Sequence, residues 1–319
     1  MAFFLVACLP WVCFILLSLY VFQLFADARR RLPPGPWPPK PLIGDLLALG
    51  KGDQQHRSLA RLADRYGPVM SLRLGTVLTV VVSTPDAMRE IFHKNKDNLA
   101  GRPTADAFNA MGHSANSLLG LEHPGVSTTS VLIEWAIADL LQNPESTRKI
   151  KEEITNVIGT NAQIQESDIT RLPYLQAVVK ETLRLRAVAP LVPRRAEATI
   201  EVQGFTIPKG TNVILNLWAI NRDARAWNDP DKFMPERFIG NDINYLGQNF
   251  QFVPFGVGRR ICLGLPLAQK VMYLVLGTLV HQFEWTLPEE LKETGIDMTE
   301  KCGMVLCLAN PLKVIAKKM

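Results

Sequence analysis

Cysteine is scarce in this sequence and irregularly spaced. Five cysteines occur among 319 residues, at positions 8, 13, 262, 302 and 307. They form neither a disulfide scaffold nor a CxxC zinc pattern. A strong excess of one charge is also lacking, with 35 Lys and Arg against 30 Asp and Glu. No basic stripe with interleaved aromatic residues is present, and we expect no nucleic-acid partner.

Other sequence signals are missing as well. We find no internal repeat and no flavin or nicotinamide fingerprint. Four histidines have no partner at metal-ligand spacing, and we interpret them as surface or structural residues: His56, His93, His113 and His281. What is present is an ordinary globular balance of 47% hydrophobic and 20% charged residues, which excludes a disordered chain.

The N-terminal segment is the longest apolar run. Residues 2–26 carry no charge, and this length is enough for a helix to span a bilayer. Arg29, Arg30 and Arg31 follow at once. Basic residues beside a span stay cytosolic, so we expect residues 1–28 to be a single-pass membrane anchor with the rest of the chain in the cytosol. A cleaved signal peptide is the alternative, but the sequence lacks a basic start and a small-residue cleavage site. Residues 29–44 contain six prolines and are predicted to form a stiff hinge.

Residues 45–319 are predicted to be mainly α-helical with small β-sheets. Hydrophobic periodicity predicts helices over 59–66, 85–93, 128–141, 144–158, 172–185 and 265–283. Strands are expected over 69–73, 76–82, 200–205 and 212–217, with long loops at 97–125 and 221–257 and a hairpin near the C-terminus. This order is not a βαβ alternation.

The most informative stretch runs from Phe255 to Gly264 and follows the spacing FxxGxRxCxG. Cys262 lies in a glycine-rich loop just before an apolar helix, where backbone amides and the helix N-terminus favour a thiolate. Small residues such as Gly258 let a large flat cofactor approach the backbone, and Arg260 can pair with a carboxylate on it. A haem held through sulfur suits this set. The alternative is a structural cysteine in a glycine-rich turn.

The chain resembles the cytochrome P-450 family at this motif and at two more. Glu181 and Arg184 match the family's ExxR helix, and Pro235–Phe238 matches its PERF segment, which contributes Arg237. The anchor and hinge resemble those of microsomal members, and the overall pattern is similar to plant A-type enzymes near the geraniol-hydroxylase-like group. The resemblance implies that Glu181, Arg184 and Arg237 form a paired structural set that holds the cysteine loop.

The resemblance also implies an activity, a cofactor and partners. It predicts a haem-thiolate monooxygenase that inserts one oxygen atom from O2 into a small apolar substrate, such as a plant terpenoid. Haem b is the cofactor, with Cys262 ligating its iron within the loop that includes Phe255, Gly258 and Gly264, and with Arg260 and Arg194 as propionate contacts. Electrons come from NADPH through NADPH–cytochrome P-450 reductase, for which exposed Arg259 and Lys270 are candidate contacts. The expected location is the endoplasmic reticulum membrane, in contact with membrane lipid.

The sequence departs from the family around the oxygen-binding helix. Thr128 matches the family's threonine and is predicted to assist oxygen protonation, while Ser127 replaces the family's acidic residue. Helix N-capping is the alternative role of both hydroxyls. The block expected between about 121 and 127 is missing, including the family's WxxxR helix and the helices over the substrate pocket, so the fold is expected to be incomplete. A non-catalytic remnant unable to hold haem, and a haem-thiolate isomerase or dehydratase, are therefore alternative functions.

Overall fold

The computed structural model describes residues 2–50, 54–101, 124–160, 162–303 and 305–319. Most of the predicted loop at 97–125 lies outside these residues, as do His113 and the part up to 123 of the junction where the missing block was expected. The α-helices are α1 (Ala2–Ala28), α2 (Gln55–Tyr66), α3 (Pro85–Asn95), α6 (Pro124–Gln142), α7 (Pro144–Ile158), α8 (Pro173–Leu185), α9 (Leu217–Ile220), α10 (Leu265–Gln282) and α11 (Glu289–Lys292). Short 3-10 helices are η1 (Leu46–Leu49), η3 (Glu166–Arg171), η4 (Pro235–Phe238) and η5 (Gly258–Arg260).

The strands form small sheets. They are β1 (Val69–Leu74), β2 (Val77–Val82), β3 (Leu191–Arg195), β4 (Ile200–Val202), β5 (Phe205–Ile207), β6 (Asn212–Asn216), β7 (Phe283–Thr286), β8 (Glu300–Cys302), β9 (Leu306–Leu308) and β10 (Ile315–Lys318). One sheet has four strands in the order β1-β2-β6-β3, and three further pairs join β4 with β5, β7 with β10, and β8 with β9. The predicted mainly helical chain with small sheets is therefore confirmed.

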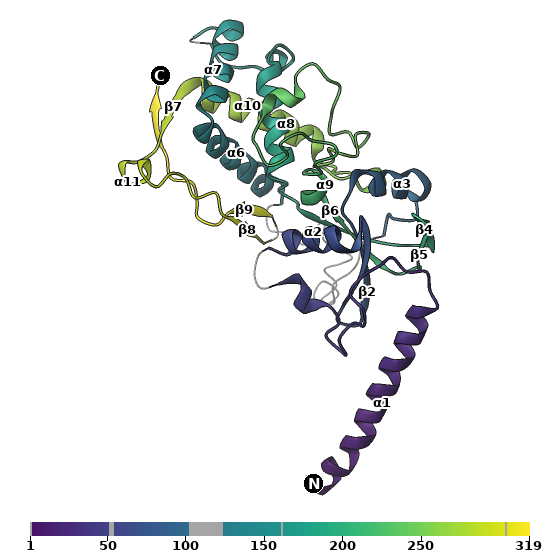
Figure 1. Ribbon diagram of the computed structural model, residues 1–319. Helices are drawn as coiled ribbons and strands as arrows, with labels where there is room; N and C mark the ends of the chain where they lie inside the picture. Colours follow the sequence, from purple (N-terminus) through teal and green to yellow (C-terminus); the bar gives the residue numbers. More distant parts are fainter. Residues whose placement is uncertain (1, 51–53, 102–123, 161, 304) are drawn as a thin grey trace.

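Helix α1 projects away from the rest of the molecule, with the N-terminus at its far end (Figure 1). Several of its large apolar side chains are exposed, including those of Trp11, Phe22 and Phe25. Among the described residues, no helix meets both the length and the apolarity needed to cross a membrane. The membrane anchor at residues 1–28 stays a prediction.

The proline-rich segment at 29–44 is held against the four-stranded sheet. The backbone N–H of Ser71 in β1 donates to the Pro34 carbonyl at 2.8 Å, and the Ser71 hydroxyl donates to the Pro33 carbonyl at 2.6 Å. Farther along, the Tyr20 hydroxyl of α1 donates to the Pro39 carbonyl at 2.7 Å. The segment is therefore hydrogen-bonded to β1 near its start and to α1 near its end, and these bonds fix its position.

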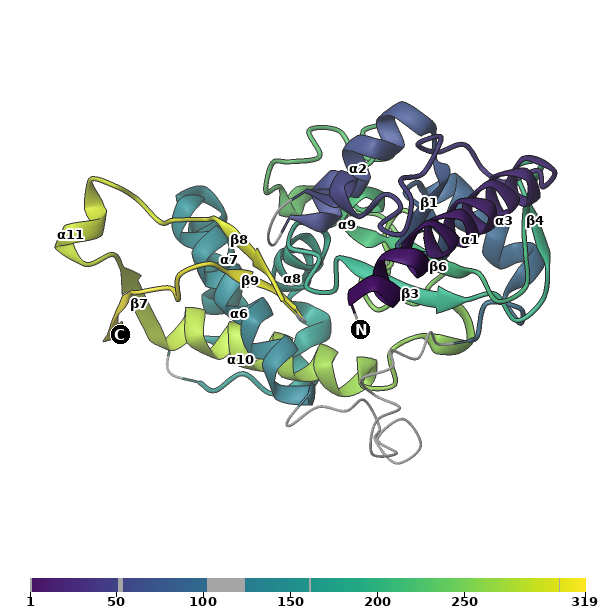
Figure 2. The ribbon, with the colours of Figure 1, turned by 90° about the horizontal axis from the view of Figure 1, so that it is seen from below.

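Two large hydrophobic cores, among the four clusters of the described residues, stabilise most of the globular part. The first joins α6, α7, α8 and α10 and includes Leu175, Val178 and Leu276, all nearly inaccessible to solvent. The second packs the four-stranded sheet against α3 through residues such as Val80 and Ile91. Helices α6, α7, α8 and α10 lie on one side of the molecule, and the four-stranded sheet with α2, α3 and α9 lies on the other (Figures 1 and 2). The cysteine loop, which precedes α10, connects these two halves.

Helix ends follow the sequence signals in part. Thr84 caps α3, because its hydroxyl accepts from the Ala87 N–H at 3.4 Å and Pro85 occupies the first turn. The N-capping alternative for Ser127 and Thr128 is wrong, because α6 begins earlier, at Pro124. The region 191–195, for which the sequence predicted no strand, is strand β3.

Candidate functional site

The cysteine loop is fixed by backbone hydrogen bonds on both sides of Cys262. The Cys262 N–H donates to the Phe255 carbonyl at 3.0 Å, and the Leu265 N–H donates to the Cys262 carbonyl at 3.3 Å. Helix α10 begins at Leu265, so the cysteine stands three residues before it. The thiol is free and exposed. The structure therefore places a thiol just before α10 and leaves it accessible.

Glycine is required in this loop for two reasons. Gly256 and Gly258 have φ values of +75° and +72°, a left-handed conformation that side chains with a Cβ rarely adopt. A Cβ at Gly258 would also lie 3.2 Å from the ring of Phe92 in α3. At Gly264 a Cβ would sit 3.8 Å from the Cys262 sulfur, which is ordinary contact. Gly256 and Gly258 therefore permit the turns of the loop, and Gly258 also permits its close packing against α3.

Arg194 and Arg260 meet beside the same loop. The Arg194 Nη2 donates to the Arg260 carbonyl at 3.4 Å, and the Arg260 Nε donates to the Ala100 carbonyl at 2.7 Å. Arg194 comes from β3 and is buried, whereas Arg260 is exposed. One positive charge therefore lies within the cysteine loop and a second contacts it from β3, which suits a cofactor with carboxylates.

The residues Glu181, Arg184 and Arg237 form one buried ionic set, which we call the carboxylate–arginine set. The Arg184 Nε and Nη2 donate to the two Glu181 carboxylate oxygens at 2.7 and 2.8 Å. The Arg237 Nε donates to Glu181 Oε1 at 3.0 Å, and Met234 N donates to the same oxygen at 2.9 Å. Glu181 and Arg184 are 0% exposed. The structure thus brings the two motifs together into a single charge cluster.

Further contacts of Arg184 and Arg237 fix the loop between α9 and the cysteine. Together the two guanidinium groups donate six hydrogen bonds to five backbone carbonyls of this loop, between Asn221 and Lys232. Both guanidinium groups also lie beside the ring of Trp227, at 5.3 and 5.8 Å from its centre. Trp227 packs against Phe252 and donates to the Gln251 carbonyl at 3.3 Å. The carboxylate–arginine set therefore supports the chain that leads into the cysteine loop.

Thr128 lies in the first half of α6 and is exposed. Ser127 lies in the same helix, but its side chain is outside the described part of the chain. One turn beyond Thr128, the side chains of Leu132 and Ile133 line a space of about 10 Å³ between α6, α8 and α10. The helix therefore packs closely against the helical core. The role of the two hydroxyls in oxygen protonation stays a prediction.

A second buried ionic cluster was missed by sequence reasoning. The Glu300 carboxylate of β8 accepts from Arg57 Nε and Nη2 of α2 at 3.0 and 2.6 Å, and it lies 3.4 Å from His56 Nε2. Arg222 Nη2 is 3.9 Å from its other oxygen. No local motif announces this cluster, because 244 residues separate His56 from Glu300.

The charges around Glu300 change its acidity. Burial alone raises the pKa of a carboxyl group, but the hydrogen bonds from His56 and Arg57 and the charges of Arg222 and Arg57 outweigh it. Together they hold the pKa of Glu300 at about 2, below its ordinary value of 4.5. The cluster ties the β8–β9 hairpin to α2, and Leu306 N donates to the Val188 carbonyl at 2.9 Å at the other end of the hairpin. The hairpin is thereby held against the chain segment that leads to Arg194.

Comparison with known proteins places these motifs in a family. The cytochrome P450 family model matches residues 33–119 and 111–316. Similar curated proteins include the cytochrome P450 76T24 of Catharanthus roseus, 46% identical over 66% of this chain and 44% of that protein. The iridoid oxidase of the same plant is 51% identical over 61% of this chain and 38% of that protein. The geranylhydroquinone 3''-hydroxylase of Arnebia euchroma is 43% identical over 63% of this chain and 40% of that protein.

Solved structures agree on the fold. A zebrafish cytochrome P450 solved with abiraterone superimposes with a TM-score of 0.70, at 21% identity, over 83% of this chain and 99% of that chain. The same fish protein solved with progesterone gives a TM-score of 0.69. The matches to the three plant proteins each cover about two fifths of those proteins' length.

Proposed function

The chain belongs to the cytochrome P450 family, and from that premise we propose that it is a haem-thiolate monooxygenase. In this proposal it inserts one oxygen atom from O2 into a small apolar substrate, with electrons from NADPH delivered by a reductase. The observation that carries the proposal is the exposed Cys262 thiol at the start of α10, fixed by backbone bonds and flanked by Arg194 and Arg260.

The residues present fit a haem. When bound, haem with a thiolate ligand supplies the oxygen-activating chemistry. Cys262 offers the thiolate, and the guanidinium groups of Arg194 and Arg260 offer charge-assisted hydrogen bonds to propionate carboxylates. Gly256 and Gly258 adopt the left-handed backbone conformation that shapes the loop around Cys262. These five positions come from β3 and the cysteine loop, which the carboxylate–arginine set supports.

Two hydroxyl groups are the candidates for handling protons. In our proposal the Thr128 hydroxyl holds a water or a proton near the oxygen-binding position. Ser127 stands where the family has an acid, and a serine hydroxyl does not ionise near neutral pH. Proton delivery is therefore expected to be slower than with a carboxylate. Ser127→Asp is expected to increase NADPH-coupled product formation, whereas Thr128→Ala is expected to decrease it.

The substrate class is proposed from the names of similar proteins. One is an iridoid oxidase and another a geranylhydroquinone hydroxylase. Both names denote oxidation of terpenoid compounds or of compounds with a terpenoid side chain. A small apolar plant terpenoid is accordingly the first substrate class to test.

A reductase and a membrane complete the proposal. Arg259 and Lys270 are exposed beside the cysteine loop, where they pair with Asp97 at 3.6 Å and Glu166 at 2.6 Å. These exposed ion pairs contribute little to stability and are easily exchanged for an acidic partner. We further propose that α1, followed by Arg29–Arg31, anchors the chain in the endoplasmic reticulum membrane with the globular part in the cytosol. Deletion of residues 1–28 should move the protein out of the membrane fraction, and a truncated form that stays there would refute this anchor.

The decisive experiment is the carbon-monoxide difference spectrum of the reduced, detergent-solubilised chain. A Soret band at the red-shifted position typical of a thiolate ligand is expected, and Cys262→Ser should abolish it. Cys307→Ser, which changes a half-buried thiol on β9, is the matched control and should keep the band. Absence of the band in the unaltered chain would favour the non-catalytic remnant. Turnover without NADPH and reductase would favour an isomerase or dehydratase.

A further inference from the structure

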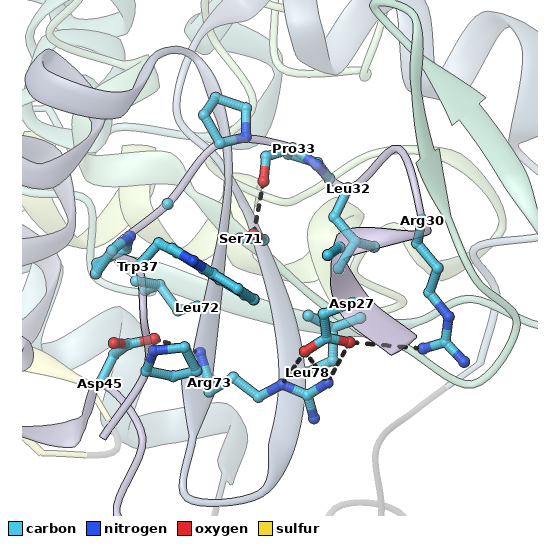
Figure 3. A pocket seen from close by; sticks show the side chains of 15 residues that line it. Asp27, Arg30, Leu32, Pro33, Trp37, Asp45, Ser71, Leu72, Arg73 and Leu78 are labelled. Atoms are coloured by element: carbon cyan, nitrogen blue, oxygen red, sulfur yellow. Dashed lines mark hydrogen bonds and ion pairs between the residues drawn. The ribbon is translucent and has the colours of Figure 1, made fainter. Parts of the chain in front are cut away.

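A hollow of about 370 Å³ lies where α1 meets the globular part. Its walls come from the end of α1, the proline-rich segment 32–39 and the β1–β2 hairpin (Figure 3). This volume is within the range of small-molecule pockets. None of the residues proposed for haem binding lines it.

The frame of the hollow is rigid. Pro33 and Pro34 are hydrogen-bonded to Ser71, and Pro39 is hydrogen-bonded to Tyr20, as described above. Gly35 approaches β1 so closely that a Cβ there would lie 1.9 Å from the Ser71 carbonyl oxygen. Proline also restricts the backbone of this segment. The walls are therefore set before any ligand arrives, which lowers the entropic cost of binding.

The two ends of the hollow differ in charge. At one end Arg30 lines it, with a half-exposed side chain and its nearest carboxylate, Asp27, 3.9 Å away. Asp27 is already engaged by Arg73, whose Nε and Nη2 donate to it at 2.6–3.1 Å. Arg30 therefore keeps most of its donor capacity for a ligand.

The opposite end presents the ring of Trp37 and the carboxylate of Asp45 (Figure 3). Asp45 Oδ2 accepts from the Arg73 N–H at 2.7 Å, which leaves further acceptor capacity on the carboxylate. Burial raises the pKa of Asp45 against the opposing effects of that hydrogen bond and of the Arg73 charge. A carboxylate in this position is stabilised by a second cation. An aromatic ring beside a carboxylate is a suitable environment for a quaternary ammonium group.

From this arrangement we infer that the hollow binds the zwitterionic phosphocholine headgroup of a membrane phospholipid. The phosphate pairs with Arg30, the ammonium lies against Trp37 and Asp45, and the apolar walls of Leu32 and Leu78 contact the glycerol region. The lining contains two acidic and two basic side chains, so its formal charge is zero and matches a zwitterion better than an anion. The inference rests on the proposed membrane attachment, because α1 ends at the hollow and brings it to the membrane surface.

The test uses the full chain in a maltoside detergent. Short-chain phosphatidylcholine is titrated below its micelle concentration, and saturation-transfer NMR detects its choline methyl protons. We expect saturable binding that Arg30→Gln weakens roughly tenfold, because a charge-assisted hydrogen bond is lost. Trp37→Leu should weaken binding roughly threefold. Arg29→Gln is the matched control, because it removes the same charge from a neighbour that does not line the hollow, and it should bind as the unaltered chain does.

Three results would overturn the inference. One is equal or tighter binding of short-chain phosphatidylglycerol, which would indicate simple attraction of anions to the basic segment. Another is full displacement of phosphatidylcholine by inorganic phosphate, which would indicate a phosphate site without headgroup recognition. The third is equal weakening by Arg29→Gln and Arg30→Gln. Flotation with phosphatidylcholine vesicles separates this question from anchoring, because Arg30→Gln should still float, whereas failure of the unaltered chain to float would refute the anchor.

Discussion

The carboxylate–arginine set and the cysteine loop hold their functional groups in opposite ways. Glu181 and Arg184 are completely buried, and both oxygens of the carboxylate are bonded to arginine nitrogens. Cys262 is exposed, and its backbone, not its sulfur, is fixed by hydrogen bonds. The first region uses its polar groups to connect parts of the chain. The second fixes the backbone and leaves the reactive atom accessible.

The difference has a physical origin. A buried charge is tolerated only when every partner is in place, so the carboxylate–arginine set has no capacity left for a ligand. A thiol at a helix start is a weak hydrogen-bonding group and costs little to expose. Substitutions in the first region should therefore change the free energy of unfolding, and substitutions in the second should change ligand binding.

Removing the Glu181 charge is the strongest way to break this comparison. Glu181→Gln leaves two buried guanidinium groups without their anion, and the free energy of unfolding should fall by about 3–5 kcal/mol. Urea denaturation followed by circular dichroism measures the loss. Glu145→Gln is the matched control, because Glu145 and Arg148 have the same i,i+3 spacing on the exposed surface of α7. If both substitutions had the same effect, burial would not be the cause.

Removing the Glu300 charge tests the second buried cluster. A pKa lowered from 4.5 to about 2 means that the ionised carboxylate stabilises the fold, by on the order of 3 kcal/mol above pH 5. That contribution is lost as the pH falls from about 5 towards 2, because the unfolded state takes up the proton first. Glu300→Gln should therefore be less stable than the unaltered chain at pH 7, with the gap closing near pH 2. Denaturation across this pH range measures the gap, and a gap independent of pH would contradict the role of the charge.

A smaller effect is expected at Gly258 in the cysteine loop. Gly258→Ala should cost about 1–2 kcal/mol in unfolding free energy, because alanine disfavours a φ of +72°. Gly159→Ala, at the end of α7, has a φ of +90° and no neighbour within 4 Å of the added Cβ. The excess loss at Gly258 over Gly159 in urea denaturation reports the contact with Phe92. No excess would show that Phe92 moves aside freely.

The smallest stability effect is expected at Cys262 itself. Cys262→Ser should change the free energy of unfolding of the haem-free chain by less than about 0.5 kcal/mol, because the thiol is exposed. The same substitution removes the proposed iron ligand. It should therefore abolish the carbon-monoxide difference band while leaving the free energy of unfolding almost unchanged. A large loss of stability in urea denaturation would instead support a structural cysteine.

Local signals allowed much of the fold and part of the site to be predicted. Apolar periodicity located the helical core, and the ExxR and PERF motifs identified the residues that the structure pairs. Strand β3 was missed because Pro193 argues against a strand. The structure resolves this conflict by placing β3 at the edge of the four-stranded sheet, beside β6, where a missing N–H is tolerated.

Non-local contacts were not predictable from one sequence. Nothing near His56 or Arg57 indicates that Glu300, at the other end of the chain, completes their cluster. The beginning of α6 was misjudged because serine and threonine are typical N-caps, yet the helix extends one turn farther, to Pro124. The hollow beside α1 was also not predictable, because three segments that are separate in the sequence meet to form it.

The four-stranded sheet also sets an order of events during synthesis. Strand β2 pairs in parallel with β6, so Thr79 lies opposite Asn212. The β1–β2 hairpin leaves the ribosome long before its partner is made, and until then one edge of β2 has unpaired backbone groups. Such an edge is a template for pairing with other chains. A nascent chain that stops before residue 212 is therefore exposed to aggregation, and translation of β6 and β3 ends this vulnerable period.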